Sequence, residues 1–125
     1  MARIIIAEDE EPLRGLIARA LTEDGHQVTA VADGTEALDA IQRERGAFDL
    51  LVTDIKMPIM DGIALALAAA RDFPHLTILL MTGFADQRER ASGLNAFVHD
   101  VVTKPFSVAD IRTAVADALA ARKAE

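Results

Sequence analysis

Polar side chains follow four short apolar runs of this sequence, each time at the carboxyl end of the run. Glu8 and Asp9 follow the first run, and Asp54 follows LLVT. Two later runs lead into Thr82 and into Lys104. Carboxylate, hydroxyl and ammonium groups gathered in one place would suit phosphoryl transfer, because the negative charge that develops on the phosphoryl oxygens would be met from several sides.

The apolar runs alternate with stretches of helical periodicity, which predicts five strand–helix units. Strands that are apolar throughout are covered on both faces, so a parallel sheet with helices on either side is expected. The second strand is the most polar and suits an edge. The predicted fold is therefore a flavodoxin-like, doubly wound α/β sandwich with five parallel strands in the order 2-1-3-4-5. The strands are expected at residues 3–7, 26–32, 48–53, 76–81 and 97–102, and the helices at 12–23, 35–44, 62–72, 86–94 and 108–122.

In open parallel sheets, ligands bind beyond the carboxyl ends of the strands, near the change in winding direction. Asp9 and Asp54 are expected on adjacent strands, with Thr82 and Lys104 on the other side of Asp54. Each pair of carboxylates would repel by about 4 kcal/mol at about 4 Å and an effective dielectric of about 20. A hard cation would relieve this repulsion. Oxygen ligands without cysteine or paired histidine predict Mg²⁺, with Mn²⁺ as an alternative.

Each residue taken alone also has an ordinary structural explanation. Glu10 and Glu11 suit the start of a helix, where the dipole favours acidic groups. Asp61 is expected to cap the helix that follows it, and Ser107 the last helix. A lone Lys104 would be a surface lysine, and the three histidines show no ligand spacing. The joint occurrence of suitable residues at four strand ends is what favours a site.

The composition limits the class of protein. The 125 residues suit one domain, expected to span 1–125, and no apolar stretch is long enough to cross a membrane. No cysteine is present, and the N-terminus lacks the features of a secretion signal, so a cytoplasmic protein is expected. A net charge of −7 with dispersed basic residues argues against direct DNA binding.

Four motifs, AEDEEP, TDIKMPIMDG, LLMTGFAD and VVTKPF, resemble those of the receiver domain of bacterial two-component response regulators. The resemblance covers essentially the whole chain. It implies that Asp54 is phosphorylated and that Glu8 and Asp9 hold Mg²⁺ together with it, Asp9 directly and Glu8 through water. The backbone carbonyl of Lys56 would complete the protein ligands.

The resemblance also implies a mechanism. Thr82 and Lys104 would contact the phosphoryl group, and the peptide bond before Pro105 would be cis. Asp54 would take the phosphoryl group from a sensor histidine kinase, a histidine phosphotransfer protein or a small acyl phosphate. Such a protein is not an enzyme for external substrates, because it catalyses only its own phosphorylation and dephosphorylation. Slow dephosphorylation is expected here because Phe84 could limit the access of water.

Signalling in this family uses the surface formed by the fourth helix, fifth strand and fifth helix. This surface has two conformational states, and phosphorylation shifts the equilibrium between them. The sequence departs from the family at Val101, where a tyrosine or phenylalanine usually turns inward as the threonine moves. A valine has no ring to swing. Phe97 and Phe106 are candidates for a substitute, although both are better expected in the core. The Ala96–Val98 corner is expected to be bulkier than usual.

Several candidate functions differ in what they require of these residues. Without an output domain, the chain is expected to be a stand-alone regulator. Its opening residues and its LLMTGFAD stretch are similar to those of CpdR-type regulators. Proteins of that type are adaptors of a ClpX-dependent protease and are active when unphosphorylated. A chemotaxis or phosphorelay receiver is the alternative. A haloacid-dehalogenase-like phosphatase would need an aspartate where Lys56 stands. A mononucleotide-binding module would need a phosphate loop where AEDEE stands, and an inert module would not need every site residue type.

Overall fold

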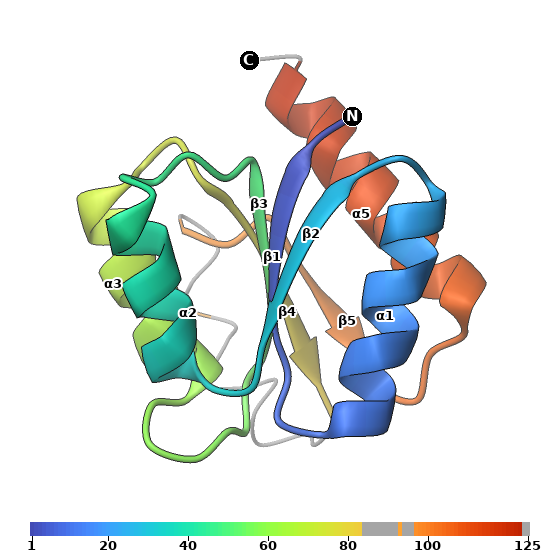
Figure 1. Ribbon diagram of the computed structural model, residues 1–125, viewed down its shortest axis with the longest axis horizontal. Helices are drawn as coiled ribbons and strands as arrows, with labels where there is room; N and C mark the ends of the chain where they lie inside the picture. The colour runs from blue at the N-terminus through green and yellow to red at the C-terminus, as the bar shows by residue number, and fades with distance from the viewer. Residues whose placement is uncertain (84–92, 94–96, 124–125) are drawn as a thin grey trace.

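One parallel sheet organises the molecule. The computed structural model describes residues 1–83, 93 and 97–123, and the strands within them follow the order β2-β1-β3-β4-β5. Helices α2 and α3 cover one face of the sheet and α1 and α5 the other (Figure 1). The predicted α/β class and strand order are thus confirmed. The elements are β1 (Arg3–Ala7), α1 (Glu11–Glu23), β2 (Gln27–Val31), α2 (Gly34–Arg43), β3 (Leu50–Asp54), α3 (Gly62–Asp72), β4 (Thr77–Thr82), β5 (Asp100–Thr103) and α5 (Val108–Lys123).

Two apolar cores lie on the two faces of the sheet, because successive residues of a strand point to opposite sides. Ile5 and Leu51 belong to the core under α2 and α3. Ile4, Ile6 and Val52 belong to the core under α1 and α5. Strands β1, β3 and β4 therefore bury both faces, while β2 is largely exposed, as expected of an edge strand.

The helix starts confirm two predicted caps. The Asp61 carboxylate accepts a hydrogen bond from the Ala64 N–H at 2.9 Å, where α3 begins. The Ser107 hydroxyl accepts from the Asp110 N–H at 3.0 Å, and the Asp110 carboxylate accepts from the Ser107 N–H. These reciprocal bonds satisfy donors that the first turn of α5 leaves free.

The last strand differs from its predicted bounds. It was expected at 97–102, but β5 runs from Asp100 to Thr103. Phe97 lies in a turn and is 49% exposed, so its predicted place in the core is wrong. Apart from Gly93, the predicted helix at 86–94, together with Phe84 and Ala96, lies outside the described residues. The other predicted boundaries agree with the structure within two residues.

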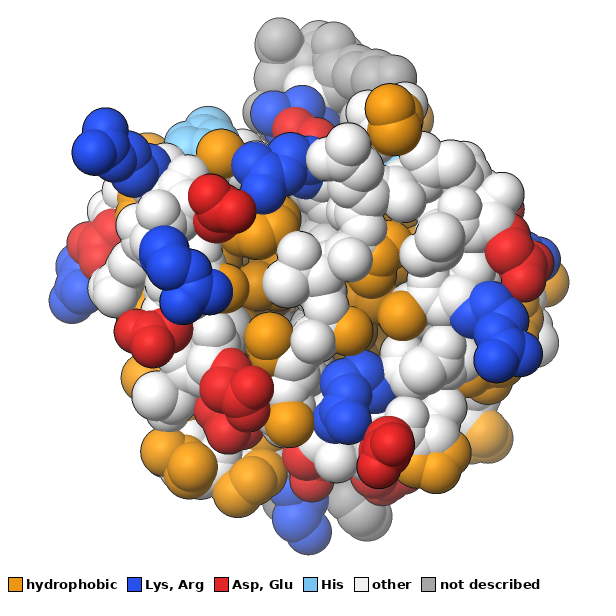
Figure 2. Space-filling view, in the orientation of Figure 1, with side chains coloured by type: hydrophobic (Ala, Val, Ile, Leu, Met, Phe, Trp, Pro, Cys, Tyr) orange, Lys and Arg blue, Asp and Glu red, His pale blue; other side chains and the backbone are white. Residues whose placement is uncertain are grey.

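Charged side chains are mixed on the visible face. Among the residues drawn in colour in Figure 2, lysine and arginine side chains lie dispersed between acidic and uncharged ones. Within the described part of the chain, no helix is both long and apolar enough to span a membrane.

Candidate functional site

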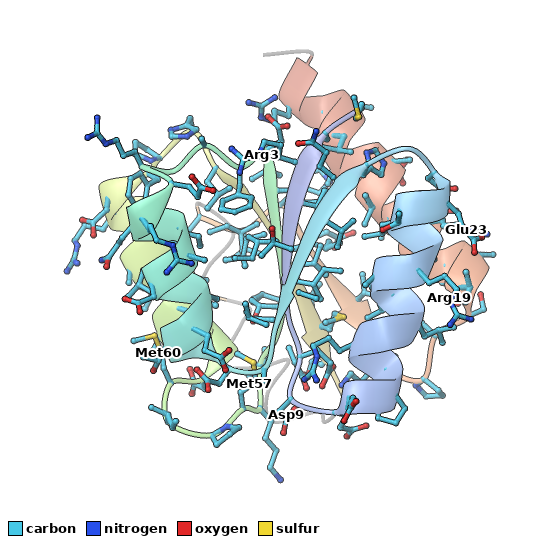
Figure 3. The ribbon with its side chains drawn as sticks, in the orientation of Figure 1. Arg3, Asp9, Arg19, Glu23, Met57 and Met60 are labelled. Carbon is cyan, nitrogen blue, oxygen red and sulfur yellow. The ribbon has the colours of Figure 1, made fainter. Side chains whose placement is uncertain are left out.

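The acidic residues predicted to form a site come together at the carboxyl edge of the sheet. Glu8 and Asp9 follow β1, and Asp54 ends the adjacent strand β3. One carboxylate oxygen from each of the three lies within 4.8 Å of the other two. Figure 3 shows Asp9 at this end of the molecule, beside the segment with Met57 and Met60 that follows β3.

Lys104 bridges two of these carboxylates. Its ammonium nitrogen lies 3.0 Å from Glu8 Oε1 and 3.0 Å from Asp54 Oδ2. The other oxygen of Glu8 accepts a hydrogen bond from the Glu10 N–H at 3.0 Å. Glu8 is fully buried and Asp54 is 5% exposed, whereas Asp9 is exposed. Glu8 is therefore held on both oxygens inside the protein, while Asp9 faces solvent at the mouth of the site.

Burial dominates the electrostatics of these groups. It raises the pKa of Glu8 to about 7, and the charge of Asp54 adds to this, against the Glu10 N–H and Lys104. Burial and then the charge of Asp9 also raise the pKa of Asp54, although the hydrogen bond from Lys104 opposes them. Burial alone would lower the pKa of Lys104, but its hydrogen bonds to both carboxylates raise it instead. One ammonium thus does not compensate the negative charge at this edge.

The donor set fits a hard divalent cation. All three grouped ligand residues offer carboxylate oxygens, which suit Mg²⁺ better than metals that prefer nitrogen or sulfur. Burial makes the Glu8 and Asp54 carboxylates costly to ionise without a cation, as their raised pKa values indicate. Lys56 lies two residues after Asp54, and its side chain is exposed. Its backbone carbonyl stays a predicted metal ligand.

The remaining predicted residues border the site. Thr82 is fully buried at the end of β4, and its carbonyl accepts a hydrogen bond from the Lys104 N–H at 2.7 Å. The Lys104–Pro105 peptide bond is cis. Val101 pairs with Leu80 and packs partly buried against the core under α2 and α3. The roles of Thr82 and Lys104 toward a phosphoryl group stay predictions.

Two residues that support the site were not identified from the sequence. Arg14 Nη1 donates a hydrogen bond to the Glu8 carbonyl oxygen at 2.9 Å. The helix dipole disfavours a positive charge in the first turn, so an arginine at this position was the sequence feature that could have indicated a special role. Gly62 packs so closely under Asp54 that a Cβ would collide with the Asp54 carbonyl oxygen. Its place after Asp61 suggested only a helix start.

Comparison with known proteins agrees with this geometry. Residues 4–116 match the response regulator receiver domain, so the chain belongs to the receiver-domain family of two-component response regulators. It is 39% identical over 111 residues to the response regulator receiver protein CpdR of Brucella abortus, covering 89% of this chain and 91% of CpdR. The family resemblance is confirmed, and it favours a receiver over the phosphatase and mononucleotide-binding alternatives.

Other relatives are longer or more distant. The chain is 36% identical over 109 residues to the transcriptional regulatory protein TcrA of Mycobacterium tuberculosis; the match covers 87% of this chain and 42% of TcrA, so the chain spans less than half of that relative. The structure of the response regulator TrrA from Thermotoga maritima, in complex with Mg²⁺ and BeF, is 28% identical with a TM-score of 0.82. That match covers 95% of this chain and 100% of TrrA.

Proposed function

We propose that this receiver accepts a phosphoryl group on Asp54 in a Mg²⁺-dependent reaction and signals through contacts with other proteins. The observation that carries the proposal is the setting of Asp54. This carboxylate ends a central strand, lies with Glu8 and Asp9 in one acidic group, and is hydrogen bonded to Lys104 at 3.0 Å. The solved Mg²⁺–BeF complex of TrrA, a relative of the same fold, supports the assignment.

The residues divide the chemistry between them. Held by Glu8, Asp9, Asp54 and the carbonyl of Lys56, Mg²⁺ would neutralise the carboxylates and bind a phosphoryl oxygen. An Asp54 oxygen forms the new bond to phosphorus as the bond to the donor nitrogen or acyl oxygen breaks. The hydrogen bond from Lys104 favours the ionised form of Asp54, against the burial that raises its pKa, and Lys104 is placed to pair with the phosphoryl oxygens.

A cavity beside Lys104 supports a protein donor. Its volume is about 430 Å³, and it opens between the start of α1 and the segment that precedes α5. Leu16 adds exposed apolar surface, with 47% of the residue accessible. Apolar surface next to a reactive group favours docking of a partner such as a histidine kinase or phosphotransfer protein. The lining residues are Glu10, Pro12, Leu13, Leu16, Lys104, Pro105 and Phe106.

For the output, we infer a CpdR-type role as a protein adaptor without direct DNA binding, in the cytoplasm. The support is the match to CpdR, which covers nearly all of that receiver protein. The contact surface we assign is the face of β5 and α5 together with the expected fourth helix. Val101 on β5 is partly buried and takes the place of the usual aromatic switch residue, so the coupling to this face must run through other side chains.

Two experiments test the proposal. Beryllofluoride with Mg²⁺ should shift amide resonances around Asp54, and Asp54→Ala should abolish those shifts, whereas Asp39→Ala on the exposed side of α2 should keep them. In parallel, wild-type and Asp54→Ala proteins serve as bait in lysate, with and without acetyl phosphate. Recovery of a protease unfoldase supports the adaptor role, while recovery of a flagellar switch protein or a phosphotransfer protein selects the chemotaxis or phosphorelay alternative.

A further inference from the structure

Arg14 reaches back from α1 to the acidic turn at the site. Its Nη1 atom donates to the Glu8 carbonyl oxygen at 2.9 Å, and its backbone N–H donates to the Glu10 carbonyl at 2.9 Å. The Glu8 N–H donates to the Val31 carbonyl of β2 at 3.1 Å. The main chain of Glu8 is therefore held on both sides, by the sheet at its N–H and by the Arg14 guanidinium at its carbonyl.

The carbonyl that Arg14 holds belongs to the peptide unit joining Glu8 to Asp9. Asp9 is exposed, and its carboxylate has no hydrogen bond or ion pair with the described residues. The position of this carboxylate thus depends on the orientation of its backbone. Turning the Glu8–Asp9 peptide would move the Asp9 oxygen away from the oxygens of Glu8 and Asp54, which now lie within 4.8 Å of it.

The charge of Arg14 and its hydrogen bond to the Glu8 carbonyl predict opposite effects on Mg²⁺ binding when the side chain is removed. A guanidinium beside a cation site repels the cation, so by charge alone its removal would tighten Mg²⁺ binding. If instead the hydrogen bond orients the ligand-bearing turn, removal would weaken binding, as the loss of groups that orient metal ligands generally does. The direction of the change therefore separates the two roles.

We propose that Arg14 is a positioning residue that strengthens Mg²⁺ binding by fixing the Glu8–Asp9 peptide, despite its own positive charge. The inference rests on the proposed magnesium site. It adds to that site a residue which touches neither the metal-binding carboxylate oxygens nor the phosphoryl group, and which acts through the backbone carbonyl of Glu8. The half-buried Arg14 side chain, lying along the first turn of α1, is well placed for this role.

Calorimetric titration with MgCl₂ at constant ionic strength tests the proposal on wild type, Arg14→Met, Arg14→Lys and Arg19→Met. Arg14→Met keeps the side-chain stem but removes the donor and the charge. Arg19 is exposed on the same helix, so Arg19→Met removes an equal charge without touching the turn. We expect the Kd for Mg²⁺ to rise about tenfold or more in Arg14→Met, and to be partly restored in Arg14→Lys. Arg19→Met should bind as wild type does or slightly more tightly.

Two further readouts separate positioning from general damage. In the metal-free protein, Arg14→Met should shift the amide resonances of Asp9 and Glu10, and Arg19→Met should not. With acetyl phosphate, Arg14→Met should need more Mg²⁺ for half-maximal phosphorylation, yet approach the wild-type rate when Mg²⁺ saturates.

Equal or tighter Mg²⁺ binding by folded Arg14→Met overturns the proposal. If urea titration shows that this variant does not fold, Arg14→Lys decides alone, because its charge is unchanged: weaker binding than wild type supports positioning, and equal binding refutes it. Absence of Mg²⁺ binding by the wild type would instead reject the magnesium site itself. Failure of the inference and failure of the proposed function are thus distinguishable.

Discussion

Glu8→Gln should stabilise the metal-free protein at alkaline pH. Burial raises the pKa of Glu8 from 4.5 to about 7, so the folded protein keeps a proton that the unfolded chain has released. Stability is therefore lost as the pH rises from 4.5 through 7, the window set by these two values. At about 1.4 kcal/mol per pKa unit, the raised pKa of Glu8 costs the fold roughly 3 kcal/mol at pH 8 and about 1 kcal/mol at pH 5.

Glutamine resembles the protonated form of Glu8 and avoids this cost. Urea unfolding in EDTA should show the variant to be more stable than wild type by about 3 kcal/mol at pH 8, with a much smaller difference at pH 5. Asp39→Asn is the control, since Asp39 is exposed on α2 and its replacement should change stability by less than about 0.5 kcal/mol at either pH.

Magnesium should reduce this difference in stability. A ligand that binds only the folded state adds stability according to its affinity, so wild type should gain more from Mg²⁺ than a variant that lacks one carboxylate. Equal stability of wild type and Glu8→Gln at pH 8 in EDTA would contradict the reasoning. It would mean that Lys104 already compensates the ionised Glu8, and that the site has no unmet negative charge for a cation.

Three more substitutions test how the site is supported. Gly62→Ala should cost about 1–3 kcal/mol in urea unfolding, because the added Cβ would collide with the Asp54 carbonyl oxygen. Gly15 on α1 has open space around it, so Gly15→Ala should instead stabilise the protein by about 0.5–1 kcal/mol. Equal effects of the two substitutions would refute the packing argument. Ser107→Ala removes the hydroxyl that caps α5 and should cost about 1 kcal/mol in thermal unfolding, so an unchanged midpoint would contradict the cap. Lys104→Met leaves two buried carboxylates unpaired, so it should lower the free energy of unfolding by about 3 kcal/mol at pH 8 without metal. Unchanged stability would contradict this expectation.

The fold was predictable because its central strands, β1, β3 and β4, are apolar on both faces. Leu50–Asp54 and Thr77–Thr82 are buried along their length, so each appears in the sequence as a continuous apolar run. β5 was less well predicted because its ends are exposed and only its middle is partly buried. Phe97 extended the apparent apolar run, although it lies in a turn outside the strand.

The members of the site and the strand ends they occupy could be predicted, but their burial and backbone contacts could not. The ends of β1, β3 and β5 place Glu8, Asp9, Asp54 and Lys104 at one edge, which follows from a parallel sheet alone. Which acid is buried depends on how the turn after β1 leaves the sheet, and the structure buries Glu8 and exposes Asp9. The contact of Arg14 with a backbone carbonyl depends on the path of the chain, so side-chain types alone do not predict it.

The most direct test of the central claim is the site of phosphorylation. The purified protein is incubated with acetyl phosphate, with Mg²⁺ or with EDTA, and the acyl phosphate is trapped and located by peptide mass spectrometry. The modification should appear on Asp54 when Mg²⁺ is present, fall sharply in EDTA, and be absent from Asp54→Asn. Modification of another residue, or an equal yield without the metal, would contradict the assignment of Asp54 as the magnesium-dependent phosphoryl acceptor.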